Sequence, residues 1–339
     1  MTGDKQYSGI ASFPSISGEV NVHVGSEGLS LQSTHNQVVL DYSQLRRFEL
    51  RGFRFLFETA DGQAELTQMG RDTDGFYEEL WRAYAERKSK ALFVEDPPVM
   101  EAEGEYSYSD DGGTAKGEAR IRLHPTCVVI LPRDEGARRI PLCFVSELSI
   151  SGYTIHIKLD TNETYELIRL GRDTIPLYDQ LVEHKRTVQQ KWIHAHQELA
   201  YDFETLIADS RDRFLVLQKL TGKDQVISGL FSPENEAFWM AAFHHNRVAV
   251  EFVCEEKTAT YIYELRGTTP DFTLRLRHAM EAMGLHREIL YLEDNELREN
   301  ALYRMALRRN SHLRFLRDCM SVRVIHTESW EKKIIEAFH

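Results

Sequence analysis

The sequence predicts a mainly β protein with added helices, built from repeated antiparallel barrel or sandwich modules that each end in a helix. Three observations support this fold class: a segment recurs about one hundred residues along the chain, apolar residues alternate with polar ones, and the spacing becomes helical after a glycine. The two copies are Glu65-Leu66 leading into Gly70-Arg71-Asp72-Thr73, and Glu166-Leu167 leading into Gly171-Arg172-Asp173-Thr174. A period this long indicates duplicated domains, because solenoid repeats run to roughly 20–50 residues.

The first copy has the pattern of several short strands followed by one helix. Alternating runs begin near Val20, and the Asp61-Gly62 dipeptide between two of them is typical of a tight β-hairpin turn. After Gly70 the apolar spacing changes to about 3.6 residues, which predicts an amphipathic helix. The expected strands cover 19–24, 29–31, 38–40, 48–50, 53–57 and 66–69, and the expected buried face of the helix carries Phe76, Tyr77, Leu80, Trp81 and Tyr84.

The second copy repeats this order of elements. Tyr178 and Leu181 correspond in register to Tyr77 and Leu80, and Gly152-Tyr153 corresponds to Gly52-Phe53. Its expected strands cover 119–123, 127–131, 140–143, 148–150, 153–159 and 165–170, and its helix begins near Thr174.

The shared Gly-Arg-Asp-Thr segment marks the start of each helix. Its aspartate or threonine (Asp72 or Thr73, Asp173 or Thr174) is expected to cap the helix by accepting a backbone N–H. A phosphate-binding turn is the alternative, but one glycine and one arginine do not make a phosphate cradle.

This order of strands and one closing helix resembles the pleckstrin-homology-like (PH-like) superfamily, a bent seven-stranded antiparallel barrel plugged by a C-terminal helix. The resemblance covers about residues 7–92 and 104–195 and rests on pattern, without a diagnostic motif. It implies binding of a peptide at a sheet edge or beside the closing helix. Some members hold inositol phosphates with basic residues in the first inter-strand loop. The corresponding loops here, Gly25-Ser26-Glu27-Gly28 and His124-Pro125-Thr126, lack such a cluster.

A fainter third copy follows, in which Tyr263-Glu264-Leu265 repeats Tyr165-Glu166-Leu167 and Gly267 precedes a helix. Short helices, an apolar run at 322–325 and a last helix near 330–338 are expected after it. The predicted organisation is a first module over 7–92, a linker over 93–103, a second module over 104–195 with its helix extended to about 207, a degenerate third module over 208–286, and a helical C-terminal extension over 287–339.

Composition narrows the classes of function. A net charge of −12 argues against binding of nucleic acid or an anionic membrane by the chain as a whole. No apolar run is long enough to span a bilayer, and the N-terminus lacks the layout of a secretory signal, so a cytoplasmic location is expected. The four cysteines are scattered without a CxxC pair, which favours free buried thiols over a zinc site or disulfides.

The sequence predicts no catalytic, cofactor-binding or metal-binding residues. His194 and His196 are two positions apart, so they would point to different faces of a helix, and a helical metal site needs a spacing of about four residues. No nucleophile elbow, Walker loop or dinucleotide motif occurs. The chain is therefore expected not to be an enzyme, although an unrecognised active site stays an alternative.

One locally basic stretch stands out near the C-terminus. It contains Arg304, Arg308, Arg309, Arg314 and Arg317, which we predict to be partner-binding residues. The chain is interpreted as a non-enzymatic scaffold or adaptor subunit of a cytoplasmic assembly, binding protein partners through its PH-like modules and this tail. The alternatives are a solvated helix face that pairs with acidic residues, or binding of nucleic acid or lipid headgroups by the arginines.

Overall fold

The computed structural model describes residues 5–110, 113–202, 216–217, 219, 226–232, 235–253 and 259–338. Within them the chain divides into two compact units, one of Met1–Ile140, Val145–Leu181 and Asn300–Arg309, the other of Pro141–Phe144, Val182–Glu299 and Asn310–His339. The first unit therefore contains the first repeat, most of the second repeat up to the first turns of its closing helix, and one helix contributed from near the C-terminus. The second contains the smaller third sheet.

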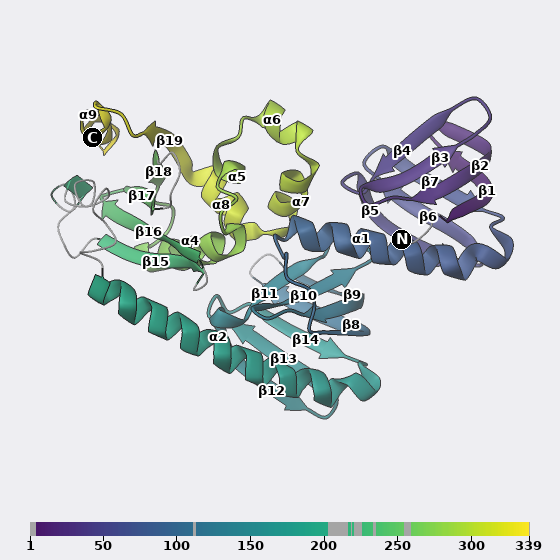
Figure 1. The fold of residues 1–339 in the computed structure, drawn as a ribbon, viewed down its shortest axis with the longest axis horizontal. Coiled ribbons are helices and arrows are strands. Elements are labelled where there is room, and N and C mark those ends of the chain that lie inside the picture. The colour runs from purple at the N-terminus through teal and green to yellow at the C-terminus, as the bar shows by residue number, and fades with distance from the viewer. Residues whose placement is uncertain are drawn as a thin grey trace. The chain divides into compact units, whose positions relative to one another are not determined.

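The first repeat is a curled seven-stranded antiparallel sheet followed by a helix, as Figure 1 shows in purple and blue. Its strand order is β4-β3-β2-β1-β7-β6-β5, so β4 and β5 are the edges. The elements are β1 (Gln6–Phe13), β2 (Ile16–Val24), β3 (Gly28–Gln32), β4 (Gln37–Asp41), β5 (Leu45–Arg51), β6 (Arg54–Thr59), β7 (Gly62–Thr67), the 3₁₀ turn η1 (Gly70–Asp72) and α1 (Thr73–Ala91). Phe55 of the sheet meets Phe76 of α1 edge-to-face at 4.8 Å inside the curl.

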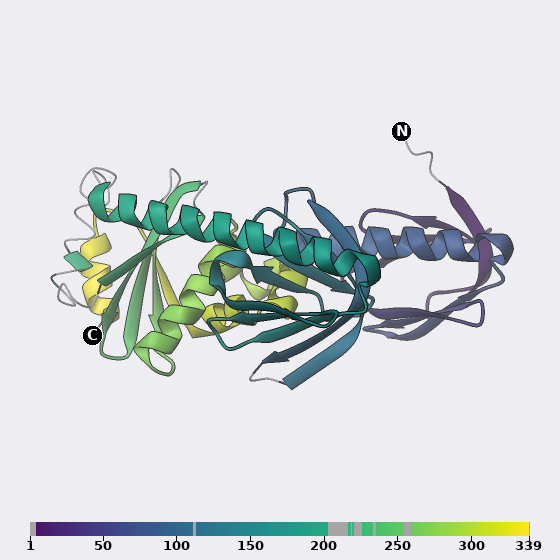
Figure 2. The same cartoon turned by 90° about the horizontal axis from the view of Figure 1, so that it is seen from below.

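The second repeat has the same topology, with strand order β11-β10-β9-β8-β14-β13-β12. Figure 2 shows its closing helix α2 as one uninterrupted helix. The elements are β8 (Met100–Asp110), β9 (Gly113–Leu123), β10 (Cys127–Pro132), β11 (Arg138–Pro141), η2 (Leu142–Phe144), β12 (Val145–Ser151), β13 (Thr154–Leu159), β14 (Thr164–Ile168), η3 (Gly171–Asp173) and α2 (Thr174–Asp202). The mixed β and α fold class and its two seven-stranded sheets, each followed by a helix, are confirmed, and they are consistent with PH-like modules.

Two predictions about these modules need correction. The first strand of each sheet, β1 and β8, was not among the expected strands, so the second sheet begins at Met100, inside the predicted linker. The predicted side-chain cap is also absent at the start of α1, where Asp72 accepts no backbone N–H. Instead Thr73 Oγ1 donates to the carbonyl of Gly70, and Thr174 Oγ1 donates to that of Gly171, each at 2.9 Å. Gly70 and Gly171 both have φ +58°, so the repeated motif is a structural turn that needs a glycine.

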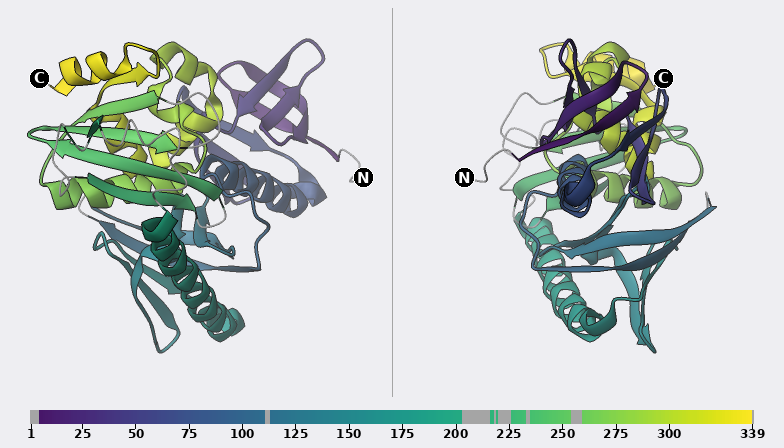
Figure 3. Two further views of the ribbon diagram at one scale, coloured as in Figure 1. Left: turned by 60° about the vertical axis from the view of Figure 1, so that its left-hand side comes forward. Right: turned by 90° about the vertical axis from the view of Figure 1, so that its right-hand side faces the viewer.

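The second unit contains a five-stranded antiparallel sheet in the order β15-β16-β17-β18-β19, whose first four strands are green in Figure 3. Its strands are β15 (Val226–Ser232), β16 (Asn235–His244), β17 (Arg247–Val253), β18 (Ala259–Glu264) and β19 (Met320–Ile325), the last taken from the predicted C-terminal extension. Besides the later part of α2, the described helices of this unit are α4 (Thr269–Met283), α5 (Glu288–Tyr291), α6 (Asp294–Glu299), α8 (Ser311–Cys319) and α9 (Trp330–Phe338), while α7 (Ala301–Arg309) belongs to the first unit. Phe272 of α4 packs on Phe243 and Tyr263, so α4 covers one face.

The opposite face of this sheet packs on α9. Ala242 and Ile262, which alternate along their strands with Phe243 and Tyr263, share a core with Trp330 and Ile334 of α9. The helix expected after Gly267 is confirmed by α4, whose C-cap is Gly284. The predicted end of the second module's helix, from 203 to about 207, and most of the predicted third module before Val226 lie outside the described residues.

Candidate interaction surfaces

Within the first unit, the edge strand β5 of the first repeat contacts the segment that follows β10 in the second repeat. Phe48, on the edge strand β5, donates its backbone N–H to the carbonyl of Arg133 at 3.2 Å, and Arg47 forms an isolated antiparallel bridge with Asp134. The segment after β10 thus extends the first sheet at its β5 edge. Because an open sheet edge readily pairs with another chain, this contact protects β5 while fixing the second repeat against the first.

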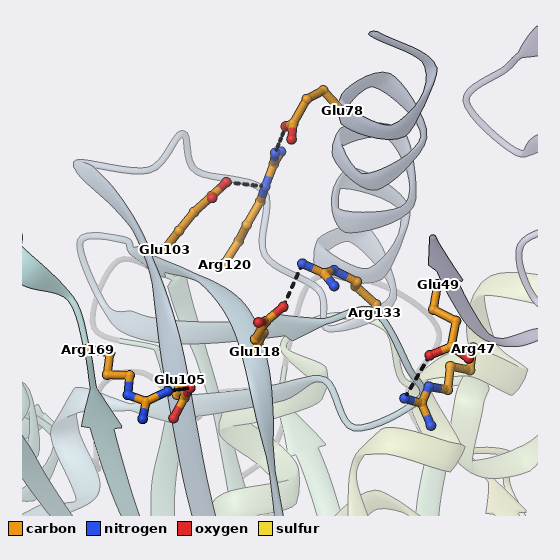
Figure 4. A network of polar contacts seen from close by, with 9 residues as sticks. All are labelled: Arg47, Glu49, Glu78, Glu103, Glu105, Glu118, Arg120, Arg133 and Arg169. Atoms are coloured by element: carbon orange, nitrogen blue, oxygen red, sulfur yellow. Dashed lines mark hydrogen bonds and ion pairs between the residues drawn. The ribbon is translucent and has the colours of Figure 1, made fainter. Parts of the chain in front are cut away.

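The junction also contains arginines that lie on aromatic rings and pair with carboxylates; Figure 4 shows the arginine–carboxylate pairs. The Arg120 guanidinium carbon lies 4.4 Å from the ring centroid of Trp81, and that of Arg133 lies 4.5 Å from the same ring. Arg120 also pairs with Glu78 of α1 at 2.5 Å and with Glu103 at 3.0 Å, and its side chain is only 7% exposed. Arginine suits such a position because its planar group can stack on a ring and bind carboxylates at its edge.

Lys88, near the end of α1, is buried in the same junction. Its Nζ donates to the carbonyls of Pro132 and Asp134 and lies 4.2 Å from the ring centroid of Tyr84. Burial, with repulsion from Arg309 as the second cause, holds the pKa of the Lys88 ammonium well below its ordinary value. The lysine therefore positions the segment beside β5 and is not a solvent-accessible base.

Helix α7 also packs on the first unit and uses three of the five predicted arginines. Arg304 donates to Ser43 Oγ at 3.0 Å, and Arg308 donates to the Ser43 carbonyl at 3.2 Å and pairs with Glu135 at 3.3 Å. Arg309 is buried and donates to the carbonyl of Met305 at 3.1 Å. Burial lowers the pKa of Arg309, while the nearby Tyr84 raises it.

The other two predicted arginines lie in the second unit, on α8. Arg317 donates to the carbonyls of Ile289 and Leu292, at 3.1 and 2.6 Å, and so satisfies the end of α5. Arg314 is exposed. The sequence stretch that reads as one basic face is thus divided between two helices of different units, and four of its arginines have partners inside their own unit. Their role in binding a partner stays a prediction.

A buried polar network lies in the second unit, between the third sheet and α9. Thr260 Oγ1 donates to Glu251 at 2.5 Å and receives a hydrogen bond from Trp330 at 2.7 Å, and His326 lies 3.0 Å from Glu251. Glu251 and Thr260 are fully buried, so this network fastens α9 to the sheet and offers no substrate access. Sequence reasoning missed this network because its members are far apart in the sequence. Glu251 lies in β17, Thr260 lies in β18, and His326 lies in the loop before α9.

An open groove of about 560 Å³ lies on the outer face of the first sheet. Its only ionisable residue is Glu19, so the groove has no acid and base pair. It is lined by Ser8, Gly9, Ile10, Glu19, Val20, Asn21, Gln32, Ser33, Thr34 and Gln68. Among the described residues no three His, Cys, Asp or Glu side chains gather where they could hold a metal ion. In that same part of the chain, no helix has the length and apolar character to cross a membrane.

Both repeats expose one aromatic side chain at the tip of the same hairpin. Phe53, between β5 and β6, is 76% exposed, and Tyr153, between β12 and β13, is 74% exposed. Phe53 also has φ +66°, which is rare for a bulky residue. The sequence repeat of Gly52-Phe53 and Gly152-Tyr153 could have indicated these tips, but alternation placed Phe53 in the strand with Phe55 and Phe57.

No protein-family model matches the chain, and no curated protein matches it. One solved structure that it resembles is that of the Spt16D Pob3N heterodimer. The comparison covers 48% of this chain and 88% of that one, at 11% identity and a TM-score of 0.21.

Proposed function

We propose that this protein is a non-enzymatic scaffold or adaptor whose two joined repeats present fixed surfaces to protein partners. The observation that carries the proposal is the junction between the repeats. A buried arginine-aromatic layer and a sheet-edge contact hold them together, while the two hairpin tips still point an aromatic ring into solvent. The spacing of the tips is then set by the protein and does not depend on a flexible linker.

The conformation of Phe53 supports a role for its hairpin tip. A bulky residue in the left-handed region costs roughly 1–2 kcal/mol, and burial of its ring does not repay that cost because the ring is 76% exposed. Backbone strain that folding does not require is common at binding sites. Aromatic side chains also carry much of the energy at protein interfaces.

The buried charged groups support a binding role over a catalytic one. Lys88, Arg120 and Glu251 each have partners that hold elements of the fold together. None of them opens into the groove on the first sheet, which Glu19 alone lines as an ionisable residue.

The test is affinity capture from extracts of the native cell at two salt concentrations, read by mass spectrometry. The bait is the intact chain or the same chain carrying Phe53→Ser and Tyr153→Ser. We expect a stoichiometric protein partner that is retained at the higher salt and is lost with the double variant. No partner, or only nucleic acid that leaves as salt rises, would contradict the scaffold role.

A further inference from the structure

The groove on the outer face of the first sheet is the counterpart of the surface on which α1 packs in the second repeat. The register of the strands fixes the correspondence: Gly9 pairs with Val20 in the first sheet, as Gly104 pairs with Ala119 in the second. Both glycines occupy the same crossing, because a Cβ on them would lie 2.8 or 2.6 Å from a backbone oxygen of the strand that precedes the closing helix. The two faces can therefore be matched residue by residue.

Charged residues of the second repeat correspond to uncharged residues in the groove. Glu103 and Arg120 face each other across β8 and β9 and form an ion pair at 3.0 Å (Figure 4). Ser8 and Asn21 take these positions in the first sheet and share a hydrogen bond at 3.1 Å. The shorter side chains explain why this face is hollowed. The further correspondences are Ile10 with Glu105, Glu19 with Glu118, Gln32 with Leu131, and Gln68 with Arg169.

In the second repeat this face is covered by a helix. Arg120 is buried there, paired with Glu78 of α1 at 2.5 Å, and its guanidinium carbon lies 4.4 Å from the ring centroid of Trp81. Leu131 shares a buried apolar cluster with Ala85, one turn further along α1. The outer face of β9 and β10 is thus a surface that binds an α-helix.

The same face of the first repeat differs in its cover. Asn21 and Gln32 are exposed, whereas their counterparts Arg120 and Leu131 are buried. Within the described residues, the helix-binding face of the second repeat therefore has an equivalent in the first repeat that is open and forms a groove of about 560 Å³.

The charge of the groove indicates which kind of helix it accepts. In the second repeat the Glu118 carboxylate pairs at 2.7 Å with Arg133, which the same repeat supplies. Counting on from Gln32, Thr34 takes the place of Arg133, and in the described part of the chain Glu19 has no ion pair. A cation for Glu19 must then come from the occupant, because complementary charges determine which partner fits a surface.

We propose that this groove binds an α-helix of a partner protein that places an arginine or lysine against Glu19. The helix lies on the outer faces of β1, β2 and β3, away from the two edge strands of the sheet. Its other facing side chains are small or polar, since hydroxyl and amide groups line most of the groove. Helix α2 of a second copy does not fit, because Asp179 stands where α1 has Glu78 and would add a second carboxylate beside Glu19.

This inference rests on the proposed scaffold function and names one surface through which it acts. The probes are three alanine-based helical peptides of equal length that differ only in a central arginine, glutamine or glutamate. On addition to the full-length chain, we expect NMR chemical-shift changes at the amides of Ser8, Asn21 and Gln32. The arginine peptide should bind at least about tenfold more tightly than the glutamate peptide. Equal affinity of the three peptides, changes confined to other amides, or no binding would overturn the proposal.

Two substitutions test the role of Glu19. Glu19→Gln removes the carboxylate and should weaken binding of the arginine peptide about tenfold. Thr34→Arg should weaken it similarly, because it supplies the cation from within the repeat, as Arg133 does for Glu118. Glu58→Gln removes an exposed carboxylate from β6 of the same sheet, and this control should bind as the unaltered chain does. Affinity that either test variant leaves unchanged would contradict the proposed pairing.

A photo-reactive amino acid at Gln32 of the full-length chain, introduced in the native cell, identifies the occupant. We expect a cross-link to a partner segment with helical periodicity and a basic residue. No cross-link, or a cross-link to the same chain or to a second copy, would overturn the proposal.

The scaffold function is judged separately, by capture of a stoichiometric partner from extracts. Capture that Glu19→Gln retains leaves the scaffold role in place and overturns the groove as its surface, whereas no partner with the unaltered chain contradicts both.

Discussion

Arg133, in the second repeat, lies over the indole ring of Trp81 in α1, with its guanidinium carbon 4.5 Å from the ring centroid. A residue that helical periodicity places on the buried face of the first module is thus buried in part by the second. The contact packs the two repeats against each other.

Trp81→Ala should destabilise the pair of repeats strongly. The indole is 3% exposed and carries both Arg120 and Arg133, so its loss leaves a cavity and removes two cation-π contacts. We expect a decrease of about 3–5 kcal/mol in the free energy of unfolding, measured by urea denaturation. Tyr153→Ala, which removes an exposed ring, should stay within about 0.5 kcal/mol of the unaltered chain. Similar losses for both variants would show that the junction does not stabilise the fold.

Phe53→Asn should stabilise the protein. Asparagine tolerates the left-handed conformation that φ +66° imposes, and the exposed phenyl ring contributes little packing. We expect the free energy of unfolding to rise by about 0.5–1 kcal/mol in thermal or urea denaturation. A substantial loss would mean that the ring packs on the fold in solution, and would remove the argument for a binding role at this tip.

Because of Lys88, the free energy of unfolding should increase as the pH rises toward about 10. Its pKa is lowered by burial, so the folded chain gives up this proton at a lower pH than the unfolded chain does. The unfolded state then binds more protons, and the free energy of unfolding rises as the pH approaches the ordinary lysine pKa of about 10.4. Denaturation curves from pH 7 to 9.5 should show a smaller slope for Lys88→Met. That range stays below the ionisation of the buried tyrosines, such as Tyr84, whose pKa burial raises to about 12.

Replacing Arg309 should lower the free energy of unfolding much more than replacing Arg314, because Arg309 is buried and Arg314 is exposed. Arg309→Ala removes a buried side chain that donates to the Met305 carbonyl, and should cost about 1–3 kcal/mol. Arg314 is exposed, so Arg314→Ala should change the free energy of unfolding by less than about 0.5 kcal/mol. If Arg314→Ala nevertheless weakens capture of a partner, the predicted binding role of that arginine gains support. Equal stability of the two variants would show that α7 does not pack on the repeats as described.

Much of the architecture could be predicted from the sequence, because local patterns specify it. The duplication, the alternation in β6 and β13, and the helical stripe of Phe76, Leu80 and Tyr84 are set by neighbours along the chain. The strands β1 and β8 were not predicted. In β1 only Tyr7 and Ala11 are fully buried among eight residues, so apolar and polar residues do not alternate clearly along it. The cap of α1 was predicted wrongly because the 3₁₀ turn that begins at Gly70 directs the Thr73 hydroxyl back to the Gly70 carbonyl.

The sequence by itself determined the repeats, the order of most elements and the character of each helix face. Only the tertiary structure decided what covers those faces: that Arg120 and Arg133 stack on Trp81, that Arg304 and Arg308 bind at Ser43, and that β5 is paired while β12 is an edge. The reason is physical. The periodicity of apolar residues indicates which side chains share a buried face. The residues that pack on that face come from distant parts of the chain, and only folding brings them within contact distance.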